Sequence, residues 1–90
     1  MSLTIVPARA TLMAGETQKF SAHLEGAPAG TVVRWVITDV QRRGSSINQN
    51  GVFTAGTLGV YHVAAVATIG ESMTLKTARV KVTVLGESEF

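Results

Sequence analysis

Apolar and polar side chains alternate along most of this chain, a pattern typical of strands that have one face in a core and the other in water. Over residues 17–25, Phe20, Ala22 and Leu24 fall on one face of an extended chain, and polar side chains fall on the other. Residues 73–85 alternate in the same way, with valines on the inner face. No segment has apolar residues at the 3.6-residue spacing of a helix, so the pattern predicts an all-β protein.

The strand predicted over residues 31–39 carries the only tryptophan, Trp35. Val33 and Ile37 lie two residues to either side and therefore share its face. Tyr61 takes an inward position on a later strand. We expect both rings to be buried between facing sheets, with the rest of the chain packed around Trp35.

Turn residues separate the remaining predicted strands. A first strand over residues 3–6 ends at Pro7, which has no N–H for a ladder, and resumes over residues 8–14. Asn50-Gly51 is a tight-turn sequence that introduces the second half of the chain. The later strands are predicted over residues 52–55, 60–68 and 73–85.

About seven short strands with turn signals roughly every 8–12 residues predict a β-sandwich. Met73 and Leu75 fall on the opposite parity from the rest of the last strand, which predicts a bulge or a change of partner before Ala78. One domain is expected over residues 1–85, and residues 86–90 are expected to be a linker or tail.

Composition fits a packed globule and excludes some classes of protein. Apolar residues make up 46% and charged residues 16% of the 90, unlike a disordered chain. The absence of cysteine excludes a disulfide framework and a zinc–thiolate site. Eight Lys and Arg residues are spread along a chain of net charge +2, so no nucleic-acid partner is expected. No apolar run approaches the length of a membrane span, and the first residues do not resemble a signal peptide.

Five stretches of the chain together resemble the bacterial immunoglobulin-like (Big) domain family. They cover nearly all of residues 3–85 and occur in the order and spacing of that family: Ala14-Gly15-Glu16-Thr17-x-x-Phe20-x-Ala22, Val33-x-Trp35-x-Ile37, Ile47-x-x-Asn50-Gly51-Val52-Phe53-Thr54-Ala55, Gly59-x-Tyr61-x-Val63-x-Ala65 and Val80-x-Val82-x-Val84. The resemblance implies an immunoglobulin-like Greek-key β-sandwich of about seven antiparallel strands, with a core tryptophan and no disulfide.

The resemblance also implies a kind of function. Such modules occur as repeats or appendages in bacterial surface adhesins, secreted polysaccharide-degrading enzymes and phage tail proteins, where they act as spacers, stalks or weak binding platforms. The family supplies no catalytic residues and no cofactor to carry over. An extracellular or cell-surface location is therefore expected. The expected partners are neighbouring domains of a larger parent protein, with a cell-surface glycan or protein as a further candidate.

The residues themselves offer no catalytic set. His23 and His62 are the only histidines, and together with Asp39 or a glutamate they are the nearest approach to a metal site. Both are expected to face outward on separate strands. The six carboxylates are scattered and form no calcium loop, so no enzyme activity, bound metal or cofactor is expected.

A polar stretch over residues 40–50 offers candidate ligand contacts. Its two arginines suit an anionic glycan or phosphate, and its amide side chains suit sugar hydroxyls, while the plainer alternative is a solvated hairpin tip. Phe53 and Val52 point to opposite faces of the strand that follows, so one of them is expected to be exposed. The candidate contacts are Arg42, Arg43, Asn48, Asn50 and Phe53.

A second candidate surface lies on the outward face of the strands predicted over residues 31–39 and 60–68. If these strands pair, as they do in immunoglobulin-like sandwiches, their short apolar side chains form one patch suited to contact with another chain or domain. The alternative is that these residues only satisfy the β-propensity of their strands. The patch consists of Val32, Val36, Val60, His62, Ala64 and Val66.

Three functional hypotheses follow from these surfaces. The first is a non-catalytic immunoglobulin-like module of a bacterial or phage surface or secreted protein, acting as a structural spacer or adhesion platform. The second is a carbohydrate-binding accessory domain of a secreted polysaccharide-degrading enzyme. The third is an assembly module that oligomerises through the outward valines.

Overall fold

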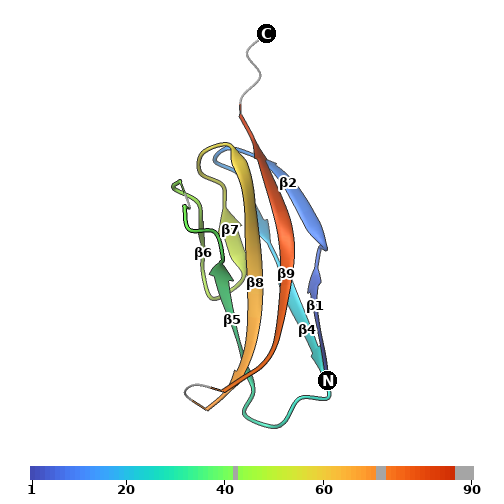
Figure 1. The fold of residues 1–90 in the computed structure, drawn as a ribbon. Helices are drawn as coiled ribbons and strands as arrows, with labels where there is room; N and C mark the ends of the chain where they lie inside the picture. The colour runs from blue at the N-terminus through green and yellow to red at the C-terminus, as the bar shows by residue number, and fades with distance from the viewer. Residues whose placement is uncertain (42, 71–72, 87–90) are drawn as a thin grey trace.

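The structure is a computed structural model that describes residues 1–41, 43–70 and 73–86. These residues form strands, turns and loops and no helix, which confirms the all-β prediction (Figure 1). Accordingly, no helix in them has the length and apolar character needed to cross a membrane. The strands are β1 (Ser2–Val6), β2 (Arg9–Met13), β3 (Thr17–Lys19), β4 (Ser21–Glu25), β5 (Val32–Ile37), β6 (Ser46–Ile47), β7 (Val52–Thr54), β8 (Gly59–Ile69) and β9 (Met73–Leu85).

The observed strands follow the predicted alternation, with one added break and one added short strand, β6, inside the stretch predicted as a polar loop. β8 and β9 match the strands predicted over residues 60–68 and 73–85, and β1 and β2 are separated at Pro7 as expected. The strand predicted over residues 17–25 is instead two strands, which part at the buried Phe20. The break arises because β3 pairs with β7 whereas β4 pairs with β1.

Hydrogen bonding divides the strands into three sheets, with the orders β2-β9-β8-β5, β1-β4 and β3-β7-β6. The four-stranded sheet lies on one side of the core, with β4 and β7 behind it in Figure 1. The β2–β9 pair is parallel, with Arg9 opposite Lys81, and the other pairs are antiparallel. The prediction of antiparallel strands throughout is therefore wrong for this pair. At Pro7 the chain stops pairing with β4 and moves to the edge of β9 without reversing its direction, so β2 runs parallel to β9.

Side chains from all three sheets meet in one hydrophobic core. Trp35 is 6% exposed and Tyr61 is 2% exposed, which confirms that both rings are buried. Trp35 packs against Phe20 with ring centroids 6.4 Å apart, and Tyr61 packs against Phe53 at 6.2 Å. Small aliphatic side chains on the inner faces of β8 and β9 belong to the same buried core as these aromatic pairs.

The pairing of β8 with β9 is irregular near the start of β9. Ala67 and Thr68 are adjacent on β8, but their partners, Lys76 and Thr74, are separated by Leu75. This extra residue is the predicted bulge, and it restores the alternation that turns the later valines of β9 inward.

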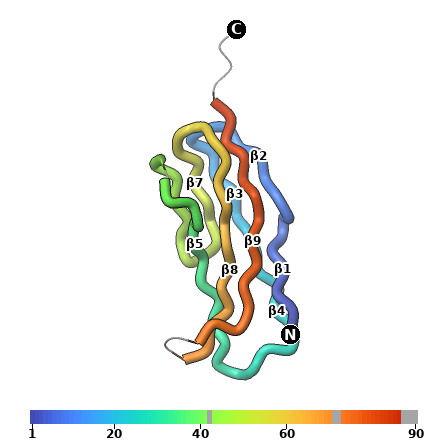
Figure 2. Tube along the Cα trace, viewed as in Figure 1, coloured from blue at the N-terminus to red at the C-terminus, as the bar shows by residue number. Residues whose placement is uncertain are grey.

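The molecule is elongated, with extents of 52 × 21 × 16 Å. β8 and β9 run along most of the long axis, as the tube in Figure 2 shows. β1 begins at one end of this axis and β9 ends at the other (Figures 1 and 2).

Candidate functional site

The loop between β6 and β7 contains Asn48 and Asn50, two of the predicted ligand contacts. Asn48 Oδ1 accepts hydrogen bonds from the backbone N–H of Asn50 at 2.9 Å and of Val52 at 3.1 Å. The Asn48 carbonyl accepts a third from the N–H of Gly51 at 3.0 Å. Asn48 therefore closes the hairpin with its side-chain oxygen, whereas Asn50 lies exposed at the tip and contributes only its backbone N–H to this network.

Phe53 lies on β7 with its side chain fully buried. It is therefore not an exposed ligand contact, since its ring packs against Tyr61 in the core. Val52 takes the more open of the two positions, as the alternation of a strand requires. Every Phe, Trp and Tyr in the described ranges is buried, so the loops there present no aromatic surface to a ligand.

Arg43 belongs to a loop that is docked against the turn after β7, while Arg42 lies outside the described residues. Arg43 has a φ of 49°, in the left-handed region, and its carbonyl accepts a hydrogen bond from Thr57 N at 2.9 Å. The buried Ser45 hydroxyl accepts a 2.9 Å hydrogen bond from Gly56 N. A Cβ on Gly56 would lie 2.5 Å from the Arg43 carbonyl oxygen, so only glycine lets the two backbones approach this closely.

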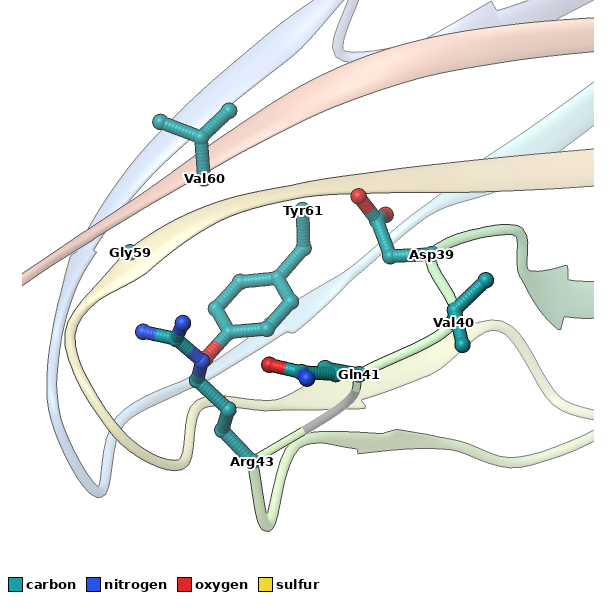
Figure 3. Close-up of a pocket in the computed structure, with 7 residues that line it drawn as sticks. All are labelled: Asp39, Val40, Gln41, Arg43, Gly59, Val60 and Tyr61. Atoms are coloured by element: carbon teal, nitrogen blue, oxygen red, sulfur yellow. The ribbon is translucent and has the colours of Figure 1, made fainter.

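A pocket of about 270 Å³ opens beside this loop (Figure 3). The side chains of Gln41 and Arg43 reach towards Tyr61, whose hydroxyl donates a 2.6 Å hydrogen bond to Thr57 O. The free polar groups are thus a guanidinium and an amide, which suit a small polar ligand rather than proton transfer. The pocket is lined by Asp39, Val40, Gln41, Arg43, Gly59, Val60 and Tyr61.

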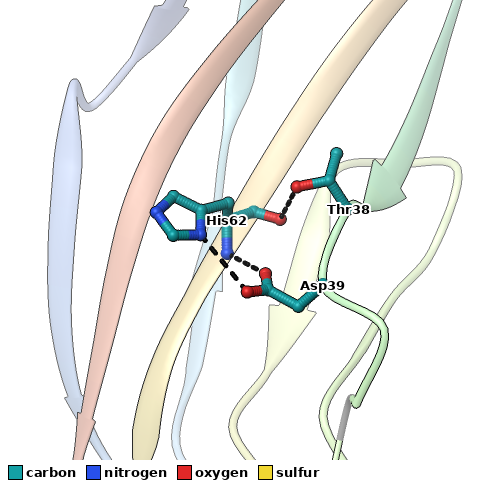
Figure 4. A network of polar contacts seen from close by, with 3 residues as sticks. All are labelled: Thr38, Asp39 and His62. Carbon is teal, nitrogen blue, oxygen red and sulfur yellow. Dashed lines mark hydrogen bonds and ion pairs between the residues drawn. The ribbon is translucent and has the colours of Figure 1, made fainter.

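Asp39 and His62 lie beside each other just after β5 ends (Figure 4). Asp39 Oδ1 accepts a hydrogen bond from the His62 backbone N–H at 2.6 Å, and Asp39 Oδ2 lies 3.3 Å from His62 Nδ1. Thr38 donates to the His62 carbonyl from its N–H at 3.0 Å and from its hydroxyl at 3.4 Å. Thr38 and Asp39 together therefore extend the ladder between β5 and β8 beyond Ile37.

The pKa of the Asp39 carboxyl group is lower than its ordinary value of 3.8. Burial by itself raises this pKa, but the backbone and side-chain hydrogen bonds from His62, together with the charge of His62, outweigh that effect. Asp39 is therefore ionised at neutral pH and serves as a hydrogen-bond acceptor.

The structure separates the two histidines that the sequence grouped with Asp39. His23 lies 3.2 Å from Glu25 on the exposed side of β4, whereas His62 contacts Asp39. In the part of the chain that the structure describes, no three His, Cys, Asp or Glu side chains are placed to hold a metal ion.

The predicted valine patch lies on the outer face of the four-stranded sheet, where β5 pairs with β8 as expected. Ala64 is the exception, because it is only 1% exposed. It faces outward opposite Val36 and Arg79, and these longer neighbours cover its methyl group. The members that remain open to solvent, wholly or in part, are Val32, Val36, Val60, His62 and Val66.

The same face carries four cations that the patch prediction leaves out. The alternation alone turns each of them outward, but only the strand pairing brings them together. β2, β9, β8 and β5 join in one sheet and place on this face the exposed side chains of Arg9, Arg34, Arg79 and Lys81.

No protein-family model matches the chain, and a search of curated proteins finds no match either. The functional inference therefore depends on the shape of the molecule and on the surfaces described above.

Proposed function

We propose that this chain is a non-catalytic, immunoglobulin-like module of a bacterial or phage surface or secreted protein, which acts outside the cell as a spacer or adhesion platform. The proposal includes the finer fold prediction, a Greek-key sandwich of the Big type, which goes beyond the all-β architecture described above. The observation that carries it is the elongated shape, with the start of β1 and the end of β9 at opposite ends.

This placement supports a role in series with other domains. In many domains the two chain ends lie close together, which suits insertion into a loop of another domain. Here the chain would enter at one end of a 52 Å axis and leave at the other, so the module would add its full length to a parent protein. Copies linked in this way form a stalk.

The hydrogen-bonded polar side chains support the non-catalytic part of the proposal, because they hold the backbone. Asn48 closes a hairpin, Ser45 docks a loop and Asp39 accepts a backbone N–H of β8. Gln49 binds both the N–H and the carbonyl of Trp35. Catalytic acids and bases instead need an atom free to reach a substrate.

The spacer role can be tested by joining two copies of the full chain in series and comparing the tandem with one copy by small-angle X-ray scattering. We expect the maximum dimension of the tandem to approach twice that of the single chain. A tandem of the same mass with a long Gly/Ser linker between the copies is the control for a flexible connection. A tandem that folds back to nearly the length of one copy would contradict the spacer role, and hydrolysis of a polysaccharide by the isolated chain would contradict the non-catalytic assignment.

A further inference from the structure

The outer face of the four-stranded sheet is rich in unpaired positive charge. The charged side chains of its four cations form no ion pair or hydrogen bond with another described residue. Of the described carboxylates, only Asp39 reaches this face, at its edge, where it is bound to His62, the residue opposite Lys81. Glu16 accepts the Met13 N–H after β2, and Glu25 lies on β4. This cationic face is defined by Arg9, Arg34, Arg79 and Lys81.

A pocket of about 320 Å³ lies where two of these cations meet. Arg9 is directly opposite Lys81 in the parallel register of β2 and β9, and Thr11 is opposite Thr83 one outward step further along. These four residues line the pocket together with Ala10. Like charges at facing positions repel each other and destabilise a sheet. An anion between Arg9 and Lys81 would attract both side chains and so offset their repulsion.

We propose that the cationic face binds an acidic polysaccharide and that a carboxylate or sulfate group occupies the pocket between Arg9 and Lys81. Both side chains can then donate charge-assisted hydrogen bonds to one anion. The hydroxyls of Thr11 and Thr83 can donate to and accept from neighbouring sugar hydroxyls. This inference rests on the platform role within the proposed function and is independent of the spacer role.

The remaining two cations extend the site diagonally across the sheet. Arg79 precedes Lys81 by two residues, or about 7 Å along β9, and Arg34 lies two strands away on β5. With neighbouring strands about 4.8 Å apart, the path from Arg9 to Arg34 is about 20 Å long. Charges spaced over this distance suit an extended polymer with repeated acidic groups, whereas a single small anion would need only Arg9 and Lys81.

Nucleic acid is also a polyanion, but this face suits it less well. Single strands are held largely by bases stacked on aromatic side chains, and every described Phe, Trp and Tyr is buried. Duplex DNA is read by elements that enter a groove, whereas the cationic face is the surface of a sheet. A polysaccharide chain requires neither feature.

The binding can be tested by titrating the full, ¹⁵N-labelled chain with dextran sulfate and with polygalacturonate and following the NMR spectrum. We expect shifts at Arg9, Thr11, Arg79 and Lys81 with either acidic polymer and none with neutral dextran. The affinity should fall as salt is added, because binding releases counterions. An absence of shifts with both acidic polymers, or shifts confined to residues 40–50, would overturn the proposal.

A matched pair of double variants separates the site from overall charge. The first variant combines Arg9→Gln with Lys81→Gln, and the second combines Lys19→Gln with Lys76→Gln. Each variant removes two positive charges. Lys19 lies on β3, and Lys76 lies opposite Ala67, a position on the core side of the sheet. We expect the first variant to weaken dextran sulfate binding about tenfold or more and the second to change it less than about twofold. Equal weakening by both would mean diffuse attraction and would overturn the site.

Two further measurements complete the test. The wild type and both variants should have similar melting temperatures, since the four substituted side chains are exposed. Oligothymidylate of similar charge should bind more weakly than dextran sulfate. Equal binding with the same sensitivity to Arg9→Gln and Lys81→Gln would assign the face to nucleic acid and overturn the polysaccharide. The spacer role would survive either failure, because the scattering experiment tests it separately.

Discussion

At the residue scale, Asp39 is a side chain that takes the place of a backbone acceptor. β5 ends at Ile37. Two residues after this end, Asp39 Oδ1 accepts the backbone N–H of His62. We expect Asp39→Asn to lower the free energy of unfolding by about 1 kcal/mol at pH 7, because a charge-assisted hydrogen bond becomes a neutral one. Water reaches the carboxylate, which is 25% exposed, and this keeps the loss small. Urea denaturation of the two proteins measures the difference.

The lowered pKa of Asp39 gives this difference a pH dependence. Because the folded-state pKa lies below 3.8, the stabilisation is fully present above that pH and is lost as the pH falls through the folded-state pKa. The gap between wild type and Asp39→Asn should therefore shrink in acid. Glu25→Gln is the control, since the His23–Glu25 pair is 71% and 70% exposed and its removal should change little. A gap that persists undiminished in acid would show that the charge of Asp39 does not contribute.

Burial was predictable from the sequence where strand alternation alone determines it. Trp35 and Tyr61 are buried as predicted, because each lies in a strand with an unambiguous apolar face. Phe53 and Val52 alternate equally well in either orientation, and only the position of β7 behind the four-stranded sheet turns Phe53 inward. Ala64 faces outward as predicted, but its cover comes from strands whose pairing no local pattern specifies.

At the element scale, one side chain closes part of the open edge of β5. β5 is the last strand of its sheet, and unpaired edge groups are a template for pairing with another chain. The N–H of Trp35 donates to Gln49 Oε1 and Gln49 Nε2 donates to the Trp35 carbonyl, both at 3.1 Å. The amide thus imitates a neighbouring strand for one residue.

We expect Gln49→Ala to lower the free energy of unfolding by about 1–3 kcal/mol, because the part-buried N–H and carbonyl of Trp35 both lose their partner. Gln49→Glu should be at least as damaging, since it sets a carboxylate against the Trp35 carbonyl. Gln18→Ala is the control, because Gln18 only binds the carbonyl of the adjacent, exposed Lys19. Urea denaturation gives the stabilities, and light scattering on heating should show earlier aggregation of both Gln49 variants. Equal behaviour of Gln49→Ala and Gln18→Ala would contradict a role in closing the edge.

Element boundaries were predictable where a strand keeps one set of partners and not where it changes them. β8 and β9 stay paired along their length, and their predicted limits and bulge agree with the structure. The alternation over residues 17–25 continues across Phe20 without interruption, so no local signal marks the exchange of partners between β3 and β4. The parallel pairing of β2 with β9 is hidden for the same reason, since it depends on where two distant segments meet.

At the scale of the whole molecule, strand pairing creates charge patterns that a count of residues conceals. Eight Lys and Arg residues are spread along the sequence and the net charge is only +2, yet four of them gather on one face. The net value is low because six Asp and Glu residues offset the eight cations in the count, wherever they lie on the molecule. The low net charge predicts no nucleic-acid partner, but it does not bear on an acidic polysaccharide, because a polyanion responds to the charge of a face rather than to the charge of the chain.

This face also determines whether copies of the chain associate. Assembly through the outward valines would bring two cationic faces together, because Val32 and Val36 flank Arg34 on β5 and Arg79 lies opposite Ala64. Each copy would bury four cations that form no ion pair with a described carboxylate. The half-exposed Val32, Val36 and Val60 gain too little to offset that cost. We therefore expect a monomer in sedimentation experiments at low salt, with any dimer weaker than a Kd of about 1 mM. Arg34→Glu together with Arg79→Glu gives the face both signs of charge and should strengthen association. A wild-type dimer at micromolar concentration that is unchanged by these substitutions would contradict the prediction and restore the valine interface.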